Sequence, residues 1–543
     1  MTLRLRIAVF ATMIPLALLQ PGAARADGIR WEACAPEFVA YFPELAPRLD
    51  CARTPVPLDH DDPAAGALVL ELVRVRAGVP AQRRGNLFTH PGGPGVPSLQ
   101  FAASLVADWE GERAPSPAKR RISERYDVIG IQSRGLQQTS PLRCRSTQLL
   151  VPHASISDDR RPENLDAVDL HAATVAAGCQ QQPHARHINT EQTARDMEWV
   201  RVRMGGEPFN YWGVSWGTEL GAWYGALFPG AVDRMILDSN VDWTRDLYHA
   251  WIAQGRARQD QFDRFVVDRV IRQPRVYGLG SQPAEVLQHF LALGTAARAM
   301  VRSSTADPEV MVAAVFLQRT VTAQPDITLD ALQAAVRQHR FSPDPAVHAA
   351  AQRMAALFAA SFFATPEEAA PLNLDPGRSV LHTVTCHSSQ SMPPPAWWRA
   401  QGDLAMAHWP VGGAHNTYEP CAFWTGPVRE RPDMQRLASI PGLVMLQAEH
   451  DWRTPLHGAL QAHGVVSTAR LVVARGLAGH GLIYNGTSAC VDEAAGAFLA
   501  DGITPPRMLD CIDGPTLRSA PTHLQRMRAG PGAAPTPARR PLR

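Results

Sequence analysis

The sequence contains 543 residues, of which 45% are hydrophobic and 19% are charged, with a formal net charge of +2. This length favours two packed units with tails over one simple core, and the hydrophobic fraction is ordinary for a globular protein. A charge so near zero excludes the basic excess that nucleic-acid binding demands, so no nucleic-acid partner is expected. Lys119 is the single lysine, which we attribute to genome composition rather than to function.

The first 26 residues have the pattern of a secretory signal peptide. Arg4 and Arg6 precede an apolar stretch at 7–19, and Ala24 and Ala26 supply small residues before a cleavage site after Ala26. The apolar stretch is too short to favour a membrane anchor, and no later stretch is long enough to span a bilayer. We therefore predict a secreted or periplasmic protein with no membrane span in the mature chain.

Seven apolar runs further along the chain have the length and residue types of buried strands. They lie at 66–77, 85–90, 126–131, 209–214, 232–238, 442–448 and 469–474. Helical patterns separate many of them, for instance at 219–228. Strands that alternate with helices predict an α/β fold with a mostly parallel sheet and helices on both faces.

The middle of the chain differs from its two ends. Helical periodicity dominates from about 245 to 430, where strand-like runs are scarce. We predict a sheet unit over 27–244 and 430–512 and a mainly helical insertion over 245–429. Residues 513–543 are rich in Pro, Ala and Arg and are expected to form a disordered tail.

The cysteines number eight, an even count that indicates disulfides in an exported chain. Their spacing favours sequential pairs, although eight cysteines allow 105 connectivities. A metal site is the alternative, but the chain has no Cys-x-x-Cys to support one. The expected pairs are Cys34–Cys51, Cys144–Cys179, Cys386–Cys421 and Cys490–Cys511.

The segment "GVSWG" at 213–217 matches the nucleophile elbow G-x-S-x-G. In this motif a serine sits on a sharp turn from strand to helix, which lifts its hydroxyl out of the sheet. The neighbouring positions are small because the strand and the helix nearly touch there. A strand-like run precedes Ser215 and a helix-like run follows it, so we predict that Ser215 is a nucleophile.

A serine nucleophile needs a histidine base and an acid that orients the histidine. After a nucleophile elbow the acid comes next along the chain, and the histidine follows the acid. Asp451 comes just after the strand at 442–448, and His480 follows the strand at 469–474 between two glycines. We predict that His480 takes the serine proton and that Asp451 orients the imidazole. Glu449 is a rival acid, and His450 is one of many histidines that could be mistaken for the base.

The stretch "HPGGPG" at 90–95 follows a strand and exposes backbone N–H groups without side-chain obstruction. Such donors stabilise the oxyanion that forms when a carbonyl is attacked. We expect one donor from Gly93 and the other from Trp216, directly after the serine. Gly92 is an alternative to Gly93, and a plain turn is the alternative to the whole role.

These motifs together resemble the secreted α/β-hydrolases of the prolyl aminopeptidase/tripeptidyl aminopeptidase group, also called TAP-like. Further similarity lies in "YDVIGIQSRGLQQTSPLRC" at 126–144, "ALFPGAVDRMILDSNVD" at 226–242 and "CAFW" at 421–424. The resemblance covers most of residues 30–512 and is strong over the sheet but poor over the helical insertion. It implies an α/β-hydrolase fold in which the insertion is a cap over the active site.

Two stretches depart from the pattern of this group. Gln132 and Ser133 stand where the group usually has Asp-Pro, and "VTCHSSQ" at 384–390 lacks an acid expected near its cysteine. An aminopeptidase also needs a negative group for the substrate ammonium, and the sequence singles out none. The candidates in or near the cap are Asp242, Asp246, Glu309, Glu367, Glu368 and Glu419.

We therefore predict a secreted serine hydrolase that needs no metal or organic cofactor. Its expected activity is that of an aminopeptidase, which releases an N-terminal residue or short peptide through an acyl-enzyme. An esterase acting on small acyl compounds is the first alternative, and a non-catalytic binding protein is the second. The expected partner is a peptide or small acyl substrate; the oligomeric state does not follow from the sequence.

Overall fold

The computed structural model describes residues 28–112, 115–364, 368–414, 419–513 and 518–519. The predicted signal peptide lies outside these residues, as does most of the predicted tail. Within the described ranges, no helix has the length and apolar character that crossing a membrane requires.

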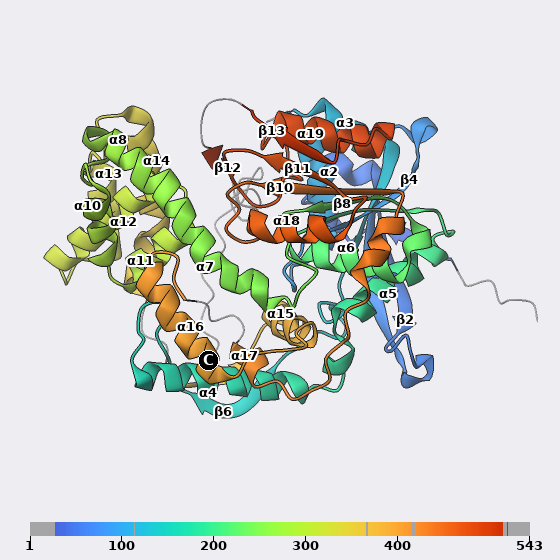
Figure 1. The fold of residues 1–543 in the computed structure, drawn as a ribbon, viewed down its shortest axis with the longest axis horizontal. Coiled ribbons are helices and arrows are strands. Elements are labelled where there is room, and N and C mark those ends of the chain that lie inside the picture. Colours follow the sequence, from blue (N-terminus) through green and yellow to red (C-terminus); the bar gives the residue numbers. More distant parts are fainter. Residues whose placement is uncertain (1–27, 113–114, 365–367, 415–418, 514–517, 520–543) are drawn as a thin grey trace, which may run out of the picture.

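One large sheet forms the centre of the sheet unit, which lies on the right in Figure 1. In the part of the chain that the structure describes, seven neighbouring strands of this sheet, from β5 to β13, run parallel to one another. The other three, β1, β2 and β3, pair antiparallel with their neighbours. The order across the sheet is β1 (Trp31–Ala33), β2 (Leu49–Pro57), β3 (Ala67–Val75), β5 (Tyr126–Ile131), β4 (Gly85–His90), β7 (Phe209–Val214), β8 (Val232–Asp238), β10 (Gly442–Ala448), β11 (Arg470–Ala474) and β13 (Met508–Cys511).

The two faces of the sheet bury two separate apolar cores. Successive residues of a strand point to opposite faces; in β4, Leu87 joins one core and Phe88 the other. Helices α2 (Leu99–Glu110), α3 (Pro117–Arg125) and α19 (Ala489–Gly496) cover the face of Leu87. Helices α5 (Thr190–Arg203), α6 (Trp216–Leu227) and α18 (Leu456–Val465) cover the face of Phe88. The short helix α1 (Pro36–Val39) lies near the antiparallel edge. This is the predicted α/β-hydrolase fold.

The chain order of the strands places the site. After β4 the chain moves to β5 on one side, and then returns to β7 on the other side of β4. The loops that follow β4 and β7 therefore diverge around a crevice at the carboxyl edge of the sheet, where open α/β sheets bind ligands. The "HPGGPG" and "GVSWG" stretches occupy these two loops.

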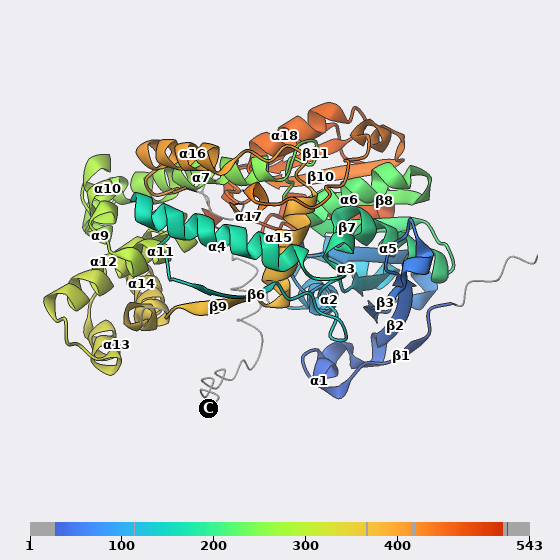
Figure 2. The same cartoon turned by 90° about the horizontal axis from the view of Figure 1, so that it is seen from below.

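A helical lid stands beside the sheet unit (Figure 2) and has a core of its own. Its helices begin directly after the loop that follows β8. They are α7 (Tyr248–Phe262), α8 (Asp268–Arg272), α9 (Pro274–Tyr277), α10 (Pro283–Leu291), α11 (Thr295–Ser303), α12 (Pro308–Ala323), α13 (Leu329–Gln338), α14 (Pro345–Phe358), α15 (Pro376–His387), α16 (Pro395–His408) and α17 (Glu419–Ala422). A short π-helical stretch, Asp263–Val267, joins α7 to α8.

The lid also includes a segment that the sequence assigned to the sheet unit. Strand β6 (Arg145–Leu150) pairs antiparallel with β9 (Ala370–Asn373), more than 200 residues later in the chain. Helix α4 (Pro162–Gln180) packs against α15 and α17. The lid therefore draws on residues 145–180 in addition to the predicted range 245–429.

All eight cysteines are joined in the four sequential pairs expected from their spacing. Cys34–Cys51 and Cys490–Cys511 lie at the two ends of the sheet, while Cys144–Cys179 and Cys386–Cys421 connect parts of the lid. In the predicted tail, Arg518–Ser519 forms strand β14, which pairs with β12 (Leu477–Ala478). Disulfides are typical of proteins outside the cytoplasm.

Candidate active site

Ser215 occupies the sharp turn between β7 and α6. Its backbone φ of 61° is in the left-handed region, which a residue other than glycine rarely adopts. The backbone N–H of Ser215 donates to the carbonyl of Asp238 at 2.9 Å, which fixes the turn to the next strand. A Cβ atom on Gly213 would lie 2.4 Å from the Gly217 carbonyl oxygen, and one on Gly217 would lie 2.9 Å from the His90 carbonyl oxygen, so both positions of the motif favour glycine.

Asp451 and His480 form a close pair. His480 Nδ1 lies 2.8 Å from Asp451 Oδ2, and the Asp451 side chain is fully buried. Further hydrogen bonds fix the orientation of the Asp451 carboxylate. Its Oδ1 accepts the backbone N–H groups of Arg453 at 2.8 Å and of Thr454 at 3.1 Å. Thr454 Oγ1 also donates to Oδ2 at 2.8 Å. A proton on Nδ1 facing the carboxylate leaves His480 Nε2 as the basic nitrogen.

The rival acid is engaged elsewhere. Glu449 accepts the backbone N–H of Gly476 at 2.7 Å and pairs with Arg475 at 3.2 Å. His450 packs edge-on against Phe265 of the lid. The structure therefore brings Asp451, and not Glu449, to His480.

A cavity of about 250 Å³ joins the predicted residues. Ser215 and His480 both line it, as do Gly93 and Trp216, the two predicted oxyanion donors. Apolar and aromatic side chains form much of the remaining wall, from the sheet unit and from α7 of the lid. They include Val96, Phe101, Val241, Ala250, Trp251 and Tyr484.

The glycine-rich loop after β4 packs directly on the serine turn. A Cβ atom on Gly92 would lie 2.3 Å from the Val214 carbonyl oxygen and 3.0 Å from the Trp216 nitrogen. Gly93, with φ of 113°, lines the cavity beside it. Gly92 thus provides the close approach of the two loops, and Gly93 is the residue that faces the cavity.

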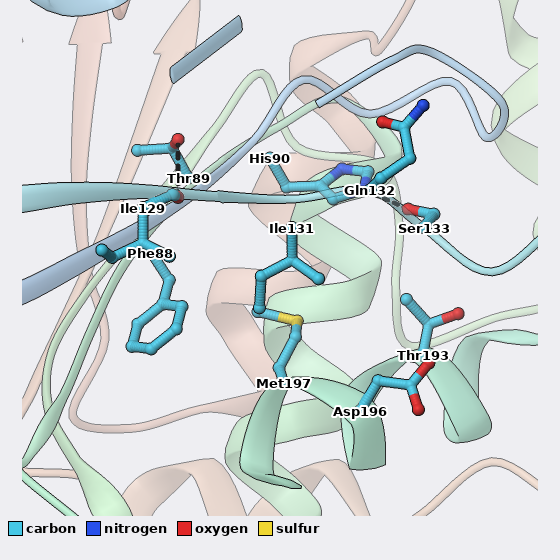
Figure 3. Close-up of a pocket in the computed structure, with 10 residues that line it drawn as sticks. All are labelled: Phe88, Thr89, His90, Ile129, Ile131, Gln132, Ser133, Thr193, Asp196 and Met197. Atoms are coloured by element: carbon cyan, nitrogen blue, oxygen red, sulfur yellow. Dashed lines mark hydrogen bonds between the residues drawn. The ribbon is translucent and has the colours of Figure 1, made fainter. Parts of the chain in front are cut away.

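His90 connects the glycine-rich loop to Ser133, which follows β5 (Figure 3). Complete burial lowers the pKa of His90 to about 3, so the ring is neutral. Its Nδ1 accepts the backbone N–H of Gly92 at 3.0 Å, which leaves Nε2–H to donate to Ser133 Oγ at 2.9 Å. Beside it, a cavity of about 10 Å³, enough for roughly one water, separates β4 and β5 from α5.

The unusual Gln132-Ser133 pair therefore has a structural role. Ser133 holds the His90 ring, and Gln132 Oε1 accepts the backbone N–H of Ser98, the residue that precedes α2. Both contacts are made on loops that border the candidate site. The sequence marked these residues as a departure but gave no sign of their partners.

Comparisons with known proteins agree with this geometry. A family model described as the alpha/beta hydrolase fold matches residues 86–273, and one described as TAP-like protein matches residues 409–511. A tripeptidyl aminopeptidase of Streptomyces coelicolor is 28% identical over 517 residues, which cover 91% of this chain and 88% of that protein. The chain is an α/β-hydrolase whose residues 409–511 match the TAP-like family.

Two mycobacterial relatives match similar lengths of this chain. Serine protease Hip1 of Mycobacterium tuberculosis is 24% identical, covering 85% of this chain and 87% of that protein. Carboxylesterase B of the same species is 26% identical, covering 91% and 93%. A solved hydrolase from Pseudomonas aeruginosa overlaps with a TM-score of only 0.31 at 12% identity, over 83% of this chain and 98% of that one; this overlap supports no comparison of sites. The relatives support a serine hydrolase enzyme.

The loop that carries His480 is held by buried groups that the sequence did not single out. Gly481 N–H donates to Ser239 Oγ at 2.8 Å, and Leu482 N–H donates to Asp238 Oδ1 at 2.9 Å. Burial raises the pKa of Asp238 to about 6. Lys119 Nζ donates to the carbonyls of Leu482 and Tyr484 at 2.8 and 2.7 Å. The only signal in the sequence was that Lys119 is the single lysine.

None of the four described acidic side chains considered for an ammonium site lines the cavity. Glu368 is exposed. Asp242 accepts from Thr244, Asp246 pairs with Arg431 at 3.0 Å, and Glu309 contacts Tyr277. Glu367 and the Glu419 side chain lie outside the described residues. Among the described residues, no cluster of His, Cys, Asp or Glu could hold a metal ion.

Proposed function

We propose that this α/β-hydrolase is a serine aminopeptidase that releases an N-terminal residue or short peptide. Ser215 is the nucleophile, His480 the general base and Asp451 the residue that orients the imidazole. One observation carries the proposal: the 2.8 Å pair of His480 and Asp451 opens on the same cavity as Ser215 on its strained turn.

The mechanism follows from this geometry. Ser215 Oγ attacks the scissile carbonyl carbon while its proton passes to His480 Nε2. The carbonyl π electrons move to oxygen, where the N–H groups of Gly93 and Trp216 stabilise the negative charge. Collapse of this intermediate breaks the C–N bond, and His480 protonates the leaving amine. Water, deprotonated by His480, then attacks the acyl-Ser215 carbonyl. The ester C–O bond breaks, His480 returns the proton to Ser215 Oγ, and the second product leaves as an acid.

The choice of a peptide substrate is supported by the relatives. The tripeptidyl aminopeptidase matches 91% of the chain, so the similarity includes the lid as well as the sheet unit. The four disulfides and the absence of a spanning helix in the described ranges are consistent with a place outside the cytoplasm. Export through the segment at 1–26 is part of the same proposal.

An esterase is the second candidate, and one observation favours it. No acidic side chain lines the described cavity, although an aminopeptidase must hold a substrate ammonium. The carboxylesterase relative spans 91% of the chain. Ester and amide cleavage use the same tetrahedral intermediate, so the same three side chains would serve.

A substrate panel tests the two candidates. An unmodified peptide, its N-acetylated twin and a set of 4-nitrophenyl esters would be incubated with the enzyme and the products identified by mass spectrometry. We expect cleavage of the free peptide near its N-terminus and loss of cleavage on acetylation. Ester turnover with no peptide cleavage would replace the aminopeptidase by the esterase.

The nucleophile is tested separately with a fluorophosphonate, which forms a covalent adduct with an activated serine. Wild-type enzyme should be labelled, and Ser215→Ala should not. In other triads, loss of the serine lowers kcat on the order of 10⁶-fold, and we expect a similar loss here. A folded wild-type protein that resists labelling would favour the non-catalytic binding protein.

A further inference from the structure

Arg453 lies in the wall of the candidate active-site cavity, together with Ser215 and His480. It belongs to the loop between β10 and α18, two residues after Asp451. Its backbone is held on both sides: the N–H donates to Asp451 Oδ1 at 2.8 Å, and the carbonyl accepts Gln254 Nε2 of the lid at 2.7 Å. The side chain therefore starts from a fixed point beside the catalytic pair.

The guanidinium of Arg453 has no acidic partner among the described residues. It lies over the ring of Trp452, 4.6 Å from the centroid, but makes no ion pair with a carboxylate. Asp451 is the nearest candidate, and its two oxygens are taken by His480, Thr454 and backbone N–H groups. Burial lowers the pKa of Arg453, and only Asp451 acts in the opposite direction.

Three other arginines whose side chains are no more than 15% exposed are paired with carboxylates. Arg134 is paired with Asp196 at 2.6 Å, Arg302 with Asp158 at 2.7 Å, and Arg431 with Asp246 at 3.0 Å. A desolvated cation is costly unless an anion and hydrogen bonds compensate it. At these three positions a carboxylate of the protein supplies that compensation. Arg453 differs from them because it lines a ligand cavity and forms no ion pair with a described carboxylate.

We propose that Arg453 binds a carboxylate of the substrate close to the scissile bond. This inference rests on the proposed function, because it assumes that the cavity holds the reacting substrate. The planar guanidinium presents paired N–H donors that match the two oxygens of a carboxylate. The carboxylate can be the free C-terminus of a short leaving fragment or an acidic side chain next to the cleaved bond. The enzyme is thus selective for substrates that carry a negative charge at this position.

Matched peptides distinguish the two sources of the carboxylate. Tetra-alanine and its C-terminal amide test the free terminus. Two longer peptide amides that differ only in Asp or Asn after the cleaved bond test the acidic side chain. We expect kcat/KM to favour the acid in one of the pairs by about 10- to 100-fold, the range of a charge-assisted hydrogen bond.

The variants assign this selectivity to one side chain. In Arg453→Gln the acid-to-amide ratio should fall to near one, mainly through KM, and Arg453→Lys should restore part of it. The ratio is the readout, so any loss common to both substrates cancels. Arg256→Gln is the matched control because it removes the same charge from α7 at a side chain that is 72% exposed; its ratio should remain that of the wild type.

A second probe is independent of peptide cleavage. Two fluorophosphonates that differ only in ending with a carboxylate or a carboxamide would be compared by their labelling rates. We expect faster labelling by the carboxylate reagent in wild type and equal rates in Arg453→Gln. Equal rates and equal kcat/KM for acid and amide in wild type would overturn the role of Arg453 while leaving the proposed function intact. Absence of labelling by either reagent would overturn the proposed function and this inference with it.

Discussion

Gly92 shows how closely the backbone of the two site loops approaches. Its φ is 91°, and the space that a Cβ would need is occupied by the Val214 carbonyl and the Ser215 Cβ at 2.3 and 2.8 Å. Both obstacles belong to rigid backbone or to the nucleophile itself. A methyl group at this position must therefore displace the turn that aims the Ser215 hydroxyl.

We expect Gly92→Ala to lose activity on the order of 10²-fold or more, because misplacement of about 1 Å has such an effect on catalysis. Gly205→Ala is the matched control: its φ is 104°, but nothing lies within 4 Å of the added atom. It should show the cost of backbone strain alone and keep wild-type kcat. Steady-state kinetics and thermal melting of both variants separate the two effects. Similar kcat values in the two variants would contradict the steric argument.

Glu219 is a buried carboxyl group on α6, one turn after Ser215. Neither of its carboxyl oxygens has a hydrogen bond of good geometry within the described ranges. Burial raises the pKa of Glu219 to about 7, Asp246 acts in the same direction, and Arg431 opposes it. Ser388 and Trp223 lie close enough to lower this pKa slightly. The folded protein therefore retains this proton above pH 4.5, where the unfolded chain releases it.

The sign of the pH effect on stability follows. The contribution of Glu219 is fully present below pH 4.5 and is lost as the pH rises through 7. A pKa displacement of this size corresponds to about 3 kcal/mol. Glu219→Gln should thus raise the free energy of unfolding at pH 8 and leave it nearly unchanged at pH 4.5, as measured by urea titration of both proteins. Other titrating groups are common to the two proteins and cancel in the difference. A variant that gains the same stability at both pH values would disprove this account.

At the scale of elements, α3 supports the loop that carries His480. Lys119 of this helix is completely buried and lies 2.6 Å from Asp492 of α19. Burial lowers the pKa of Lys119 and raises that of Asp492, while their mutual attraction opposes both changes. The lysine also donates to two carbonyls of the loop at Leu482 and Tyr484.

Removing this cation should cost about 3–5 kcal/mol, because Lys119→Met leaves a buried carboxylate and two carbonyls without their partner. Arg120→Met is the control on the same helix; its side chain is 59% exposed and its pair with Glu124 spans 3.8 Å, so it should change stability by less than about 1 kcal/mol. Urea unfolding measures both. Asp492→Asn added to Lys119→Met should recover part of the loss, and equal effects at 119 and 120 would argue against the buried pair.

The sequence predicted the central strands closely but not the edges of the sheet. Strands β4, β5, β7, β8 and β10 have the predicted bounds because each is mainly apolar and is buried along most of its length on both faces. Strand β2 was missed because it contains Pro55 and Pro57. These prolines are tolerated because β1 pairs only with residues 50–52 of β2. At Pro55 and Pro57 the outer edge of β2 has no neighbouring strand among the described residues, so no hydrogen bond between strands is lost there.

The same contrast holds for the candidate site. Ser215, Asp451 and His480 were found because glycines and strand ends mark them in the sequence. Ser133, Asp238 and Lys119 act through partners far away in the chain, and nothing local distinguishes them. The pairing of β6 with β9 is equally invisible, because it depends on two segments that meet only after the lid has folded.

At the scale of the whole molecule, helix α7 connects the lid to the candidate site (Figure 1). Ala250, Trp251 and Gln254 line the cavity, and Gln254 also holds the backbone of Arg453. Gln261, near the end of the helix, donates to the carbonyl of His450 at 2.8 Å. The lid thus braces the loop that presents Asp451 as well as covering the cavity.

Helices α8 to α14 of the lid share an apolar core separate from the two sheet cores, whereas Val380 and Val384 of α15 pack in a sheet core. We therefore expect the outer lid and the sheet unit to differ in local stability. The bridge Cys386–Cys421 joins α15 to α17 across 35 residues, whereas Cys34–Cys51 closes 17 residues at the edge of the sheet. Replacing either pair by alanine should cost about 2–4 kcal/mol through the greater freedom of the unfolded chain.

In calorimetry, loss of the lid bridge should lower the temperature of a first transition and leave the main transition of the sheet unit in place. Loss of the Cys34–Cys51 bridge should lower the main transition instead. Activity should disappear at the first transition, because α7 would then release the loop of Asp451 and Arg453. A single transition that moves by the same amount in both variants would show that lid and sheet unfold as one cooperative unit.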